Sequence, residues 1–444
     1  GIPAKTKHNE VAPAQHELAP VFDTTNVAVD HNQLTMEVMK KVADKHDLVC
    51  LLHEKPFEGI NGSGKHNNWS MITDDGVNLL DPGKTPAENI QFLVFLMAVI
   101  KAVDEYADLL RISVASAGND HRLGANEAPP AVVSIFLGDE LTEVLKSIEN
   151  DTYFTSHGAV QMDIGATVLP HFVKDNTDRN RTSPFAFTGN KFEFRMLGSA
   201  ASVANPNIVL NTAVAEALDQ FAKELADVAP EDMEHAVHEL IKRAIKKHKR
   251  VIFNGNGYTD EWIEEAAKRG LYNLKSTPDA MPMWIADKNI ELFTKHSIFT
   301  SEEIHSRYDI WLENYSKTIN IESNTMVEMV QKDLLPSVLS YVEEIASTAS
   351  LKASVVPGIS CKSETTLITK LSELSDAMTK GLEKLKVDTA KAKATEDVLE
   401  NAKLYQTEVL EDMEELRRSA DEAETLIPDD LLPYPTYGKL LFYI

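Results

Sequence analysis

Carboxylate side chains stand close together near the start of this 444-residue chain. Residues 7–17 read KHNEVAPAQHE, and Glu10 and Glu17 are seven positions apart. On one flat strand such side chains point to opposite faces, whereas a turn near Pro13 would let both carboxylates converge. Convergent carboxylates repel each other unless a hard cation such as Mg²⁺ or Mn²⁺ lies between them. The segment is therefore a candidate metal site, and the alternative is a pair of exposed acids on a loop.

A second segment is rich in glycine. Residues 59–70 read GINGSGKHNNWS, in which Gly59, Gly64 and Lys65 imitate the spacing of a phosphate-binding P-loop. His66 stands where a P-loop carries Ser or Thr, and the residues that follow indicate a strand hairpin instead of the required helix. The P-loop interpretation therefore fails. His66 stays a candidate metal ligand, with a structural histidine as the alternative.

A third segment combines opposite charges in a loop. Residues 119–130 read NDHRLGANEAPP and place Arg122 and Glu127 among glycine and proline. This combination suits carboxylate recognition or a mobile flap. The alternative is a surface ion pair, and the segment by itself leaves both open.

A fourth segment concentrates positive charge in a protein whose net charge is −25. Residues 178–195 read DRNRTSPFAFTGNKFEFR. An acidic protein that handles anions has to gather its cations locally. Four cations form a candidate anion pocket: Arg179, Arg181, Lys191 and Arg195. Glu193 and Arg195 are two apart on an alternating run, so they should share one face of a strand.

The four segments together supply oxygen ligands, an imidazole, glycine loops and clustered arginines. These groups suit metal-assisted phosphoryl transfer, in which cations neutralise the charge of the transferring phosphate. Composition and spacing lead no further than this class of chemistry.

The elements that must position these segments differ along the chain. Residues 1–210 contain short apolar runs between turn signals, which predict mostly antiparallel strands interrupted by helices at 35–46 and 86–111. Helical patterns dominate afterwards. Two apolar stripes, within 367–385 and 398–420, predict an antiparallel helical hairpin whose faces pack within the chain or dock another subunit. The expected fold class is α+β.

Composition excludes several classes of function. Lys and Arg number 44 against 69 Asp and Glu, and this acid excess argues against nucleic acid as a partner. Two cysteines, Cys50 and Cys361, form no disulfide framework or zinc motif, which fits a reducing cytoplasm. The longest apolar run, Phe92–Ile100, is about half of a membrane span, so no membrane partner is expected.

At these same residues the chain resembles glutamine synthetase, specifically its long type III branch. The segments 7–17, 59–70, 119–130 and 178–195 carry the resemblance, and Ala204-Asn205-Pro206-Asn207 resembles the helix entry after the last active-site strand of the family. The resemblance implies the curved antiparallel sheet of the glutamine synthetase and guanidino kinase catalytic fold, followed by a long helical region. We expect four parts: a catalytic sheet at 1–215, its helical continuation at 216–360, the helical hairpin at 361–427 and an extended tail at 428–444.

The resemblance also implies an activity and its metal sites. Enzymes of this family join ammonia to L-glutamate at the expense of ATP, through γ-glutamyl phosphate, and use two or more Mg²⁺ or Mn²⁺ ions. Glu10 and Glu17 would bind the metal nearer the glutamate, and His66 and Glu193 the metal that bridges the ATP phosphates.

Substrate and catalytic roles follow by the same resemblance. Glutamate-binding positions would be Asn61, Gly62, Arg122 and Arg195. Arg181 would stabilise the phosphoryl group in flight, and Glu127 would be the flap acid that deprotonates ammonium and shields the intermediate from water. Positions near the nucleotide would be Asn68, Ser70 and Lys191. The family forms stacked-ring homo-oligomers, so the resemblance implies a dodecamer.

Two departures from the family pattern matter. Ala186 stands where other branches carry a second arginine, so the ATP role of that arginine must be filled elsewhere. In the family, a β-grasp domain and a strand with two further metal-binding glutamates precede the Glu10 motif, and neither is present before Gly1. The chain therefore reads as the C-terminal portion of a longer enzyme, and the isolated portion is expected to lack part of the site.

Other functions remain open from the sequence. One is a γ-glutamyl-amine ligase of the same fold. A guanidino kinase is disfavoured because no cysteine lies near Arg122–Glu127. Another alternative, from a different class, is a non-catalytic assembly or regulatory subunit made from the truncated chain.

Overall fold

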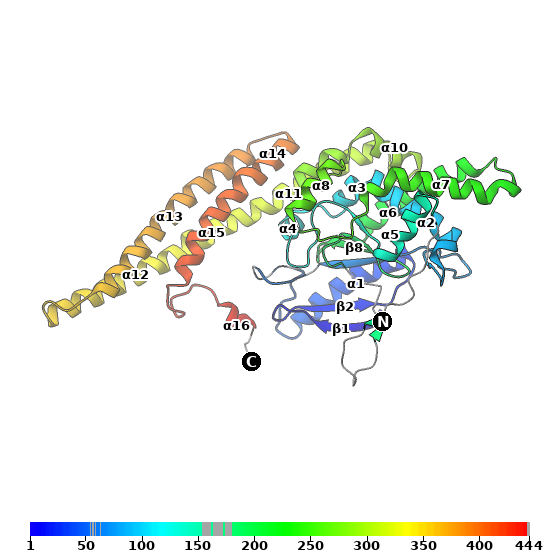
Figure 1. The fold of residues 1–444 in the computed structure, drawn as a ribbon. Helices are drawn as coiled ribbons and strands as arrows, with labels where there is room; N and C mark the ends of the chain where they lie inside the picture. Colours follow the sequence, from blue (N-terminus) through cyan, green and yellow to red (C-terminus); the bar gives the residue numbers. More distant parts are fainter. Residues whose placement is uncertain are drawn as a thin grey trace. The chain divides into compact units, whose positions relative to one another are not determined.

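The computed structural model describes residues 1–53, 55, 57, 59–62, 64–152, 161–162, 172–173 and 180–441. The chain divides into two compact units, Gly1–His305 and Ser306–Ile444, which we call the N-terminal unit and the C-terminal unit (Figure 1). Strands occur in the first and long helices make up the second, so the α+β class is confirmed. Among the described residues, no helix is both long and apolar enough to span a membrane.

The N-terminal unit contains a mixed four-stranded sheet in the order β3-β8-β7-β4. Its strands are β3 (Lys65–Trp69), β4 (Ile135–Phe136), β7 (Phe185–Phe187) and β8 (Phe192–Leu197). The predicted antiparallel pairing holds for β3–β8 and β7–β8, whereas β4 runs parallel to β7. Two-stranded sheets pair β1 (Ala4–Asn9) with β2 (His16–Pro20), and β5 (Gln161–Met162) with β6 (Phe172–Val173).

Aromatic residues hold this sheet to the helix behind it. The Phe185 and Phe192 rings stack with centroids 4.7 Å apart, and Phe92 of α2 (Ile90–Glu105) contacts Phe187 at 5.9 Å. Burying each such ring contributes about 2 kcal/mol or more. Figure 1 shows α2 on one side of β8, and the β1–β2 hairpin together with α1 (Thr25–Asp44) on the other. Glu193 and Arg195 alternate with the phenylalanines along β8, so their side chains lie on the opposite face of the strand from those rings.

The helices of the N-terminal unit follow the sequence pattern with shifted ends. They are α1 (Thr25–Asp44), α2, α3 (Ala107–Ile112), α4 (Ala117–Arg122), α5 (Asp139–Glu149), α6 (Ala204–Leu225), α7 (Met233–His248), α8 (Asp260–Lys268), α9 (Thr277–Ala280) and α10 (Asp287–Lys295), with 3₁₀ turns at Pro86–Glu88, Pro230–Asp232, Lys249–Val251 and Met281–Met283. The single helix predicted for 86–111 is wrong. The Asn89 side chain accepts from the Phe92 amide and starts α2 there, and a non-helical Tyr106 separates α2 from α3.

A buried glutamate joins α6 to the end of α10. Glu216, whose side chain is 9% exposed, lies 2.6 Å from Lys295 Nζ and 2.6 Å from His296 Nε2. Burial alone would raise the pKa of Glu216, but hydrogen bonds from Lys295, Gln220 and His296 lower it further than burial raises it. The charged carboxylate is therefore the form that stabilises this helix contact.

We expect Glu216→Gln to lower the free energy of unfolding by about 2 kcal/mol at pH 7, because it leaves Lys295 without its buried partner. Since the pKa of Glu216 is lower in the folded than in the unfolded state, this contribution is complete above the unfolded value of about 4.3 and disappears as pH falls through the folded value. Urea unfolding of both proteins at pH 7 and at successively lower pH measures the difference. A difference that did not shrink in acid would contradict this account.

The C-terminal unit consists of long helices. α11 (Ser301–Glu328) continues through a π-helical turn at Met329–Leu334 into α12 (Leu335–Val355), and α13 (Lys362–Lys393) follows. The chain then returns through α14 (Val398–Leu404), a second π-helical turn at Tyr405–Val409 and α15 (Leu410–Glu424). A Cβ atom on Gly381 of α13 would lie 3.2 Å from Leu416 Cδ1, so glycine permits the close packing of α13 on α15. The predicted antiparallel hairpin is confirmed.

The tail expected to be extended from residue 428 is not wholly extended. A short helix, α16 (Tyr437–Leu441), follows the last proline, and the Leu440 amide donates to the Thr436 carbonyl at 3.0 Å. No proline after Pro435 prevents this turn. The domain boundaries predicted at residues 215, 360 and 427 rest on changes in sequence pattern, and they stay predictions. The boundary between the two compact units of the structure follows His305.

Candidate active site

The first cluster of the site lies on the β1–β2 hairpin. The strands pair with His8 opposite Glu17 and Asn9 opposite His16, and the Glu10 amide donates to the Gln15 carbonyl at 2.9 Å across the turn. The turn places Ala14 at a positive φ of 54°. This reversal brings Glu10 back towards Glu17, so the predicted convergence of the two carboxylates is confirmed.

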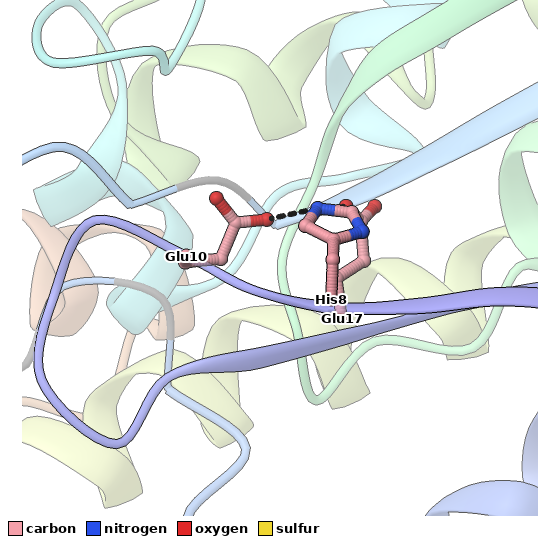
Figure 2. A group of neighbouring side chains, drawn as sticks. All are labelled: His8, Glu10 and Glu17. Carbon is pink, nitrogen blue, oxygen red and sulfur yellow. Dashed lines mark hydrogen bonds and ion pairs between the residues drawn. The ribbon is translucent and has the colours of Figure 1, made fainter.

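Figure 2 shows the His8 ring beside the Glu10 carboxylate, with Glu17 behind it. Its Nε2 atom lies 3.2 Å from Glu10 Oε1 and 2.8 Å from Glu17 Oε2. One ligand atom of each of the three residues lies within 4.8 Å of the other two. Sequence reasoning missed His8, because only the strand register puts it opposite Glu17.

The charge of this cluster depends on its neighbours. Burial raises the pKa of Glu17, and Glu10 raises it further, while His66 and His8 act in the opposite direction. Two carboxylates held close together repel each other, and a divalent cation bound between them would offset this repulsion.

The second cluster lies on the paired strands β3 and β8. His66 Nδ1 lies 3.1 Å from Glu193 Oε1, and Arg195 Nη2 lies 2.7 Å from Glu193 Oε2. The β3–β8 pairing shifts register between Lys65 and Asn67, so His66 lies at an irregularity in the strand pairing. Such irregularities commonly change the direction in which a side chain points. Glu193 and Arg195 share one strand face, as their spacing predicts.

Glu193 carries a full negative charge at neutral pH. Burial alone would raise its pKa, but the hydrogen bond from His66 and the Arg195 charge lower the pKa to about 2. The Glu193 side chain is 7% exposed and that of Arg195 is 4% exposed. A buried, ionised carboxylate next to an imidazole is a suitable donor set for a divalent cation.

The candidate nucleotide positions gather at one end of the same strands. Asn68 lies opposite Glu193 in the β3–β8 register. The Ser70 hydroxyl donates to the Asn190 carbonyl at 3.0 Å, immediately before Lys191. Residues 68, 70 and 191 therefore lie near one another, and their role at the nucleotide stays a prediction.

The third cluster joins two loops. Arg181 Nη1 lies 2.8 Å from Glu127 Oε1, in a pair whose side chains are 76% and 23% exposed respectively. The Gly62 amide donates to the Asn126 carbonyl at 3.4 Å, so the Asn61–Gly62 loop adjoins the loop that carries Glu127. The structure therefore brings both the glycine segment and the arginine segment into contact with the loop that carries Glu127.

A loop that sequence reasoning missed supports this third cluster. The Gly257 amide donates to Thr182 Oγ1 at 2.7 Å, and the Asn180 amide group donates to the Gly255 carbonyl at 2.6 Å. Burial raises the pKa of Tyr258 in the same loop, and the nearby Glu127 charge adds to this effect. Only the repeated asparagine and glycine residues at 254–257 could have indicated a loop with such a role.

Arg122 has surroundings that its sequence context did not reveal. Its side chain is buried, with Nη1 donating to Asn119 Oδ1 at 2.8 Å and Nη2 to the Arg195 carbonyl at 2.8 Å. The guanidinium thus binds backbone carbonyls of β8, and its role as a carboxylate ligand stays a prediction. Asp178 and Arg179 of the fourth segment, and Ser63 of the glycine segment, lie outside the described residues.

Both acidic clusters fit a hard divalent cation. His8, Glu10 and Glu17 offer two carboxylates and one imidazole, and Glu193 with His66 offers one of each. Mg²⁺ and Mn²⁺ accept such oxygen-rich donor sets, whereas a structural zinc site would call for cysteines. When bound, the cations would supply charge neutralisation for phosphoryl chemistry.

We expect Glu17→Gln to weaken Mn²⁺ binding about tenfold or more, because it removes a charged ligand from the hairpin cluster. Titration of the protein with Mn²⁺, followed by the electron paramagnetic resonance signal of free Mn²⁺, measures the affinity. Glu37→Gln is the matched control, since Glu37 is an exposed residue of α1 that pairs with Lys41. Equal Mn²⁺ affinity in the two variants would remove the hairpin cluster from the list of metal sites.

Comparison with known proteins identifies relatives over the whole chain. Residues 1–133 match the family model described as the glutamine synthetase catalytic domain, and residues 236–352 match the glutamine synthetase C-terminal domain. A glutamine synthetase of Butyrivibrio fibrisolvens is 60% identical over 447 residues, which cover 100% of this chain and 63% of that protein. A type-3 glutamine synthetase of Dictyostelium discoideum is 46% identical over 450 residues, covering 100% of this chain and 61% of that protein.

These relatives are longer than this chain. A glutamine synthetase of Bacteroides fragilis is 39% identical, and the matched residues cover 62% of it, so the chain spans about three-fifths of the length of the three relatives. A solved structure titled "GmaS/ADP complex-Conformation 1" aligns with a TM-score of 0.43 and 17% identity, covering 72% of this chain and 57% of that one.

Proposed function

Because the chain belongs to the glutamine synthetase family, we propose that it carries most of the active site for joining ammonia to L-glutamate with ATP, giving L-glutamine, ADP and phosphate. The observation that supports this most is the presence of two acidic clusters that suit divalent cations. One brings His8, Glu10 and Glu17 together on the hairpin, and in the other His66 lies 3.1 Å from Glu193. A reaction between a carboxylate and a polyanion needs such concentrated cation sites.

The first step would form the acyl phosphate. The γ-carboxylate oxygen of glutamate attacks the terminal phosphorus of ATP, and the bond from that phosphorus to ADP breaks. Arg181, whose side chain is 76% exposed, can turn from Glu127 towards the transferring phosphoryl group. Arg195, held by Glu193 at 2.7 Å, would hold the side-chain carbonyl of glutamate.

The second step would form the amide. Glu127 would take a proton from ammonium, and ammonia would attack the acyl carbon. Phosphate would leave with the electron pair of the broken bond, and the nitrogen would lose a second proton to the departing phosphate. Loop 123–128, which carries Glu127, would exclude water while the acyl phosphate exists. In this proposal Asn61, Gly62 and Arg122 hold the amino and carboxylate ends of glutamate, and Asn68, Ser70 and Lys191 lie towards the nucleotide.

Assembly is part of the same proposal. We propose a homo-oligomer of stacked rings, because the family resemblance implies one, and a dodecamer is the expected stoichiometry. Light scattering of the purified protein measures its mass, and a monomeric mass at micromolar concentration would contradict this part.

A hydroxylamine-trapping assay tests the activity. The protein is incubated with glutamate, ATP, hydroxylamine and Mg²⁺ or Mn²⁺, and γ-glutamyl hydroxamate is the expected product. Competition with ammonium and with ethylamine distinguishes the proposed enzyme from a γ-glutamyl-amine ligase, because ammonium should compete more strongly. If no product forms, the part of the Butyrivibrio protein that this chain does not match is added, and continued absence of product would overturn the proposal.

A further inference from the structure

A buried ion pair joins α3 to α4 and has no role in the function proposed above. Arg111 Nη2 lies 2.7 Å from Asp120 Oδ1, and the two side chains are 1% and 11% exposed. Arg111 also donates to the carbonyls of Leu274 at 2.7 Å and Lys275 at 3.0 Å, while the Thr277 amide donates to Asp120 Oδ2 at 2.5 Å. The pair therefore fastens α4 to both α3 and the segment that enters α9.

The residues next to Asp120 in α4 contact the site strand. Asn119 Nδ2 donates to the Met196 carbonyl at 2.8 Å, and Arg122 Nη2 donates to the Arg195 carbonyl at 2.8 Å. The side chain of Arg195 is the one that pairs with Glu193. Helix α4 consequently lies between the Arg111–Asp120 ion pair and strand β8.

Loop 123–128 begins where α4 ends, and its backbone is strained. The φ angles of Gly124, Asn126 and Glu127 are +105°, +50° and +71°. A residue other than glycine in this region costs about 1 kcal/mol or more and persists only where the surroundings enforce it. The hydrogen bond from the Leu123 amide to the Asn119 carbonyl, at 3.2 Å, connects the start of the loop to the helix. A fixed α4 is therefore a condition for the position of Glu127.

We propose that Arg111 and Asp120 are positioning residues that hold loop 123–128, and with it Glu127, closed over the acyl phosphate. The role of the loop rests on the proposed function, whereas its dependence on the ion pair does not. If the pair is broken, water reaches the intermediate, adds to the acyl carbon and displaces phosphate. Glutamate is then regenerated, and one ATP is spent without glutamine.

Asp120→Asn tests the proposal against a matched control. Asp104 of α2 is also buried, at 3% exposure, and lies 2.7 Å from Arg250 Nε and 2.8 Å from His248 Nδ1. Asp104→Asn therefore makes the same chemical change in a buried ion pair away from the site. Arg111→Lys is a second variant that keeps the charge but cannot reach all the acceptors of Arg111.

Amide hydrogen exchange of the full chain measures how firmly α4 and loop 123–128 are held, and it does not require enzymatic activity. Peptides covering 117–128 should exchange about fivefold faster or more in Asp120→Asn than in the unmodified protein, and to an intermediate extent in Arg111→Lys. Asp104→Asn should leave these peptides unchanged. Unchanged exchange in both pair variants, or equal acceleration in Asp104→Asn, would overturn the proposal.

The ratio of phosphate released to glutamine formed gives the second readout. Asp120→Asn should raise this ratio from about one to several, whereas a variant that is only less stable should lower both rates together. A ratio that stays at one in an active Asp120→Asn protein would refute the role in shielding. If the unmodified protein forms no product even after the unmatched part of the Butyrivibrio protein is added, the proposed function fails, and hydrogen exchange alone decides whether the ion pair positions the loop.

Discussion

Glu193→Gln is expected to reduce the proposed ligase activity about 1,000-fold or more. Glu193 is the common partner of His66 at 3.1 Å and Arg195 at 2.7 Å, so the substitution removes a proposed metal ligand and leaves Arg195 buried beside a neutral amide. The carboxylate is ionised at neutral pH, because its pKa is lowered to about 2, and glutamine cannot reproduce that charge. The hydroxamate assay and Mn²⁺ titration measure the loss.

Loss of stability has to be separated from loss of chemistry in this experiment. Removing one partner of a buried ion pair costs about 3–5 kcal/mol. Glu216→Gln is the matched control, since Glu216 is also a buried, ion-paired glutamate with a 9% exposed side chain, and it lies outside the three clusters. Glu193→Asp keeps the charge and should retain part of the activity. Equal activities in Glu193→Gln and Glu216→Gln, measured well below their unfolding temperatures, would exclude Glu193 from the chemistry.

The sequence predicted how some of the candidate site residues are placed better than it predicted their surroundings. Strand alternation was sufficient to place Glu193 and Arg195 on one face, because both lie within a single element, β8. The convergence of Glu10 and Glu17 required a chain reversal near Pro13, which residue types can indicate. Both predictions depend on contacts that are local in the sequence.

Local sequence patterns could not predict contacts between segments that are distant in the sequence. His8 enters the hairpin cluster through the register that pairs it with Glu17, and register depends on how the turn is built. The burial of Arg122 follows from carbonyl groups 73 and 74 residues away, which no local pattern reveals. The pairing of Arg111 with Asp120 likewise needs the folded arrangement of α3, α4 and α9. The residues that position the site are thus harder to predict than those that carry its charge.

Glu127→Gln is expected to reduce glutamine formation about 100-fold or more while phosphate release falls less, because the proposed removal of a proton from ammonium is lost and the shape of the loop is retained. The ratio of phosphate to glutamine should therefore rise. Glu127 pairs with Arg181 at 2.8 Å, and Arg181 is 76% exposed, so the pair contributes little to stability. The variant should unfold at nearly the same urea concentration as the unmodified protein.

This combination distinguishes Glu127 from the residues that position it. Asp120→Asn should speed the exchange of the 117–128 peptides, whereas Glu127→Gln should leave them nearly unchanged and still impair the amide-forming step. Raising the hydroxylamine concentration should rescue Glu127→Gln in the hydroxamate assay, because hydroxylamine is largely uncharged at neutral pH and does not need the proton removal that ammonium requires. Glu127→Gln could instead show no rescue and an unchanged ratio of phosphate to product. That result would show that Glu127 keeps the loop closed through its ion pair with Arg181 and does not act as a proton acceptor.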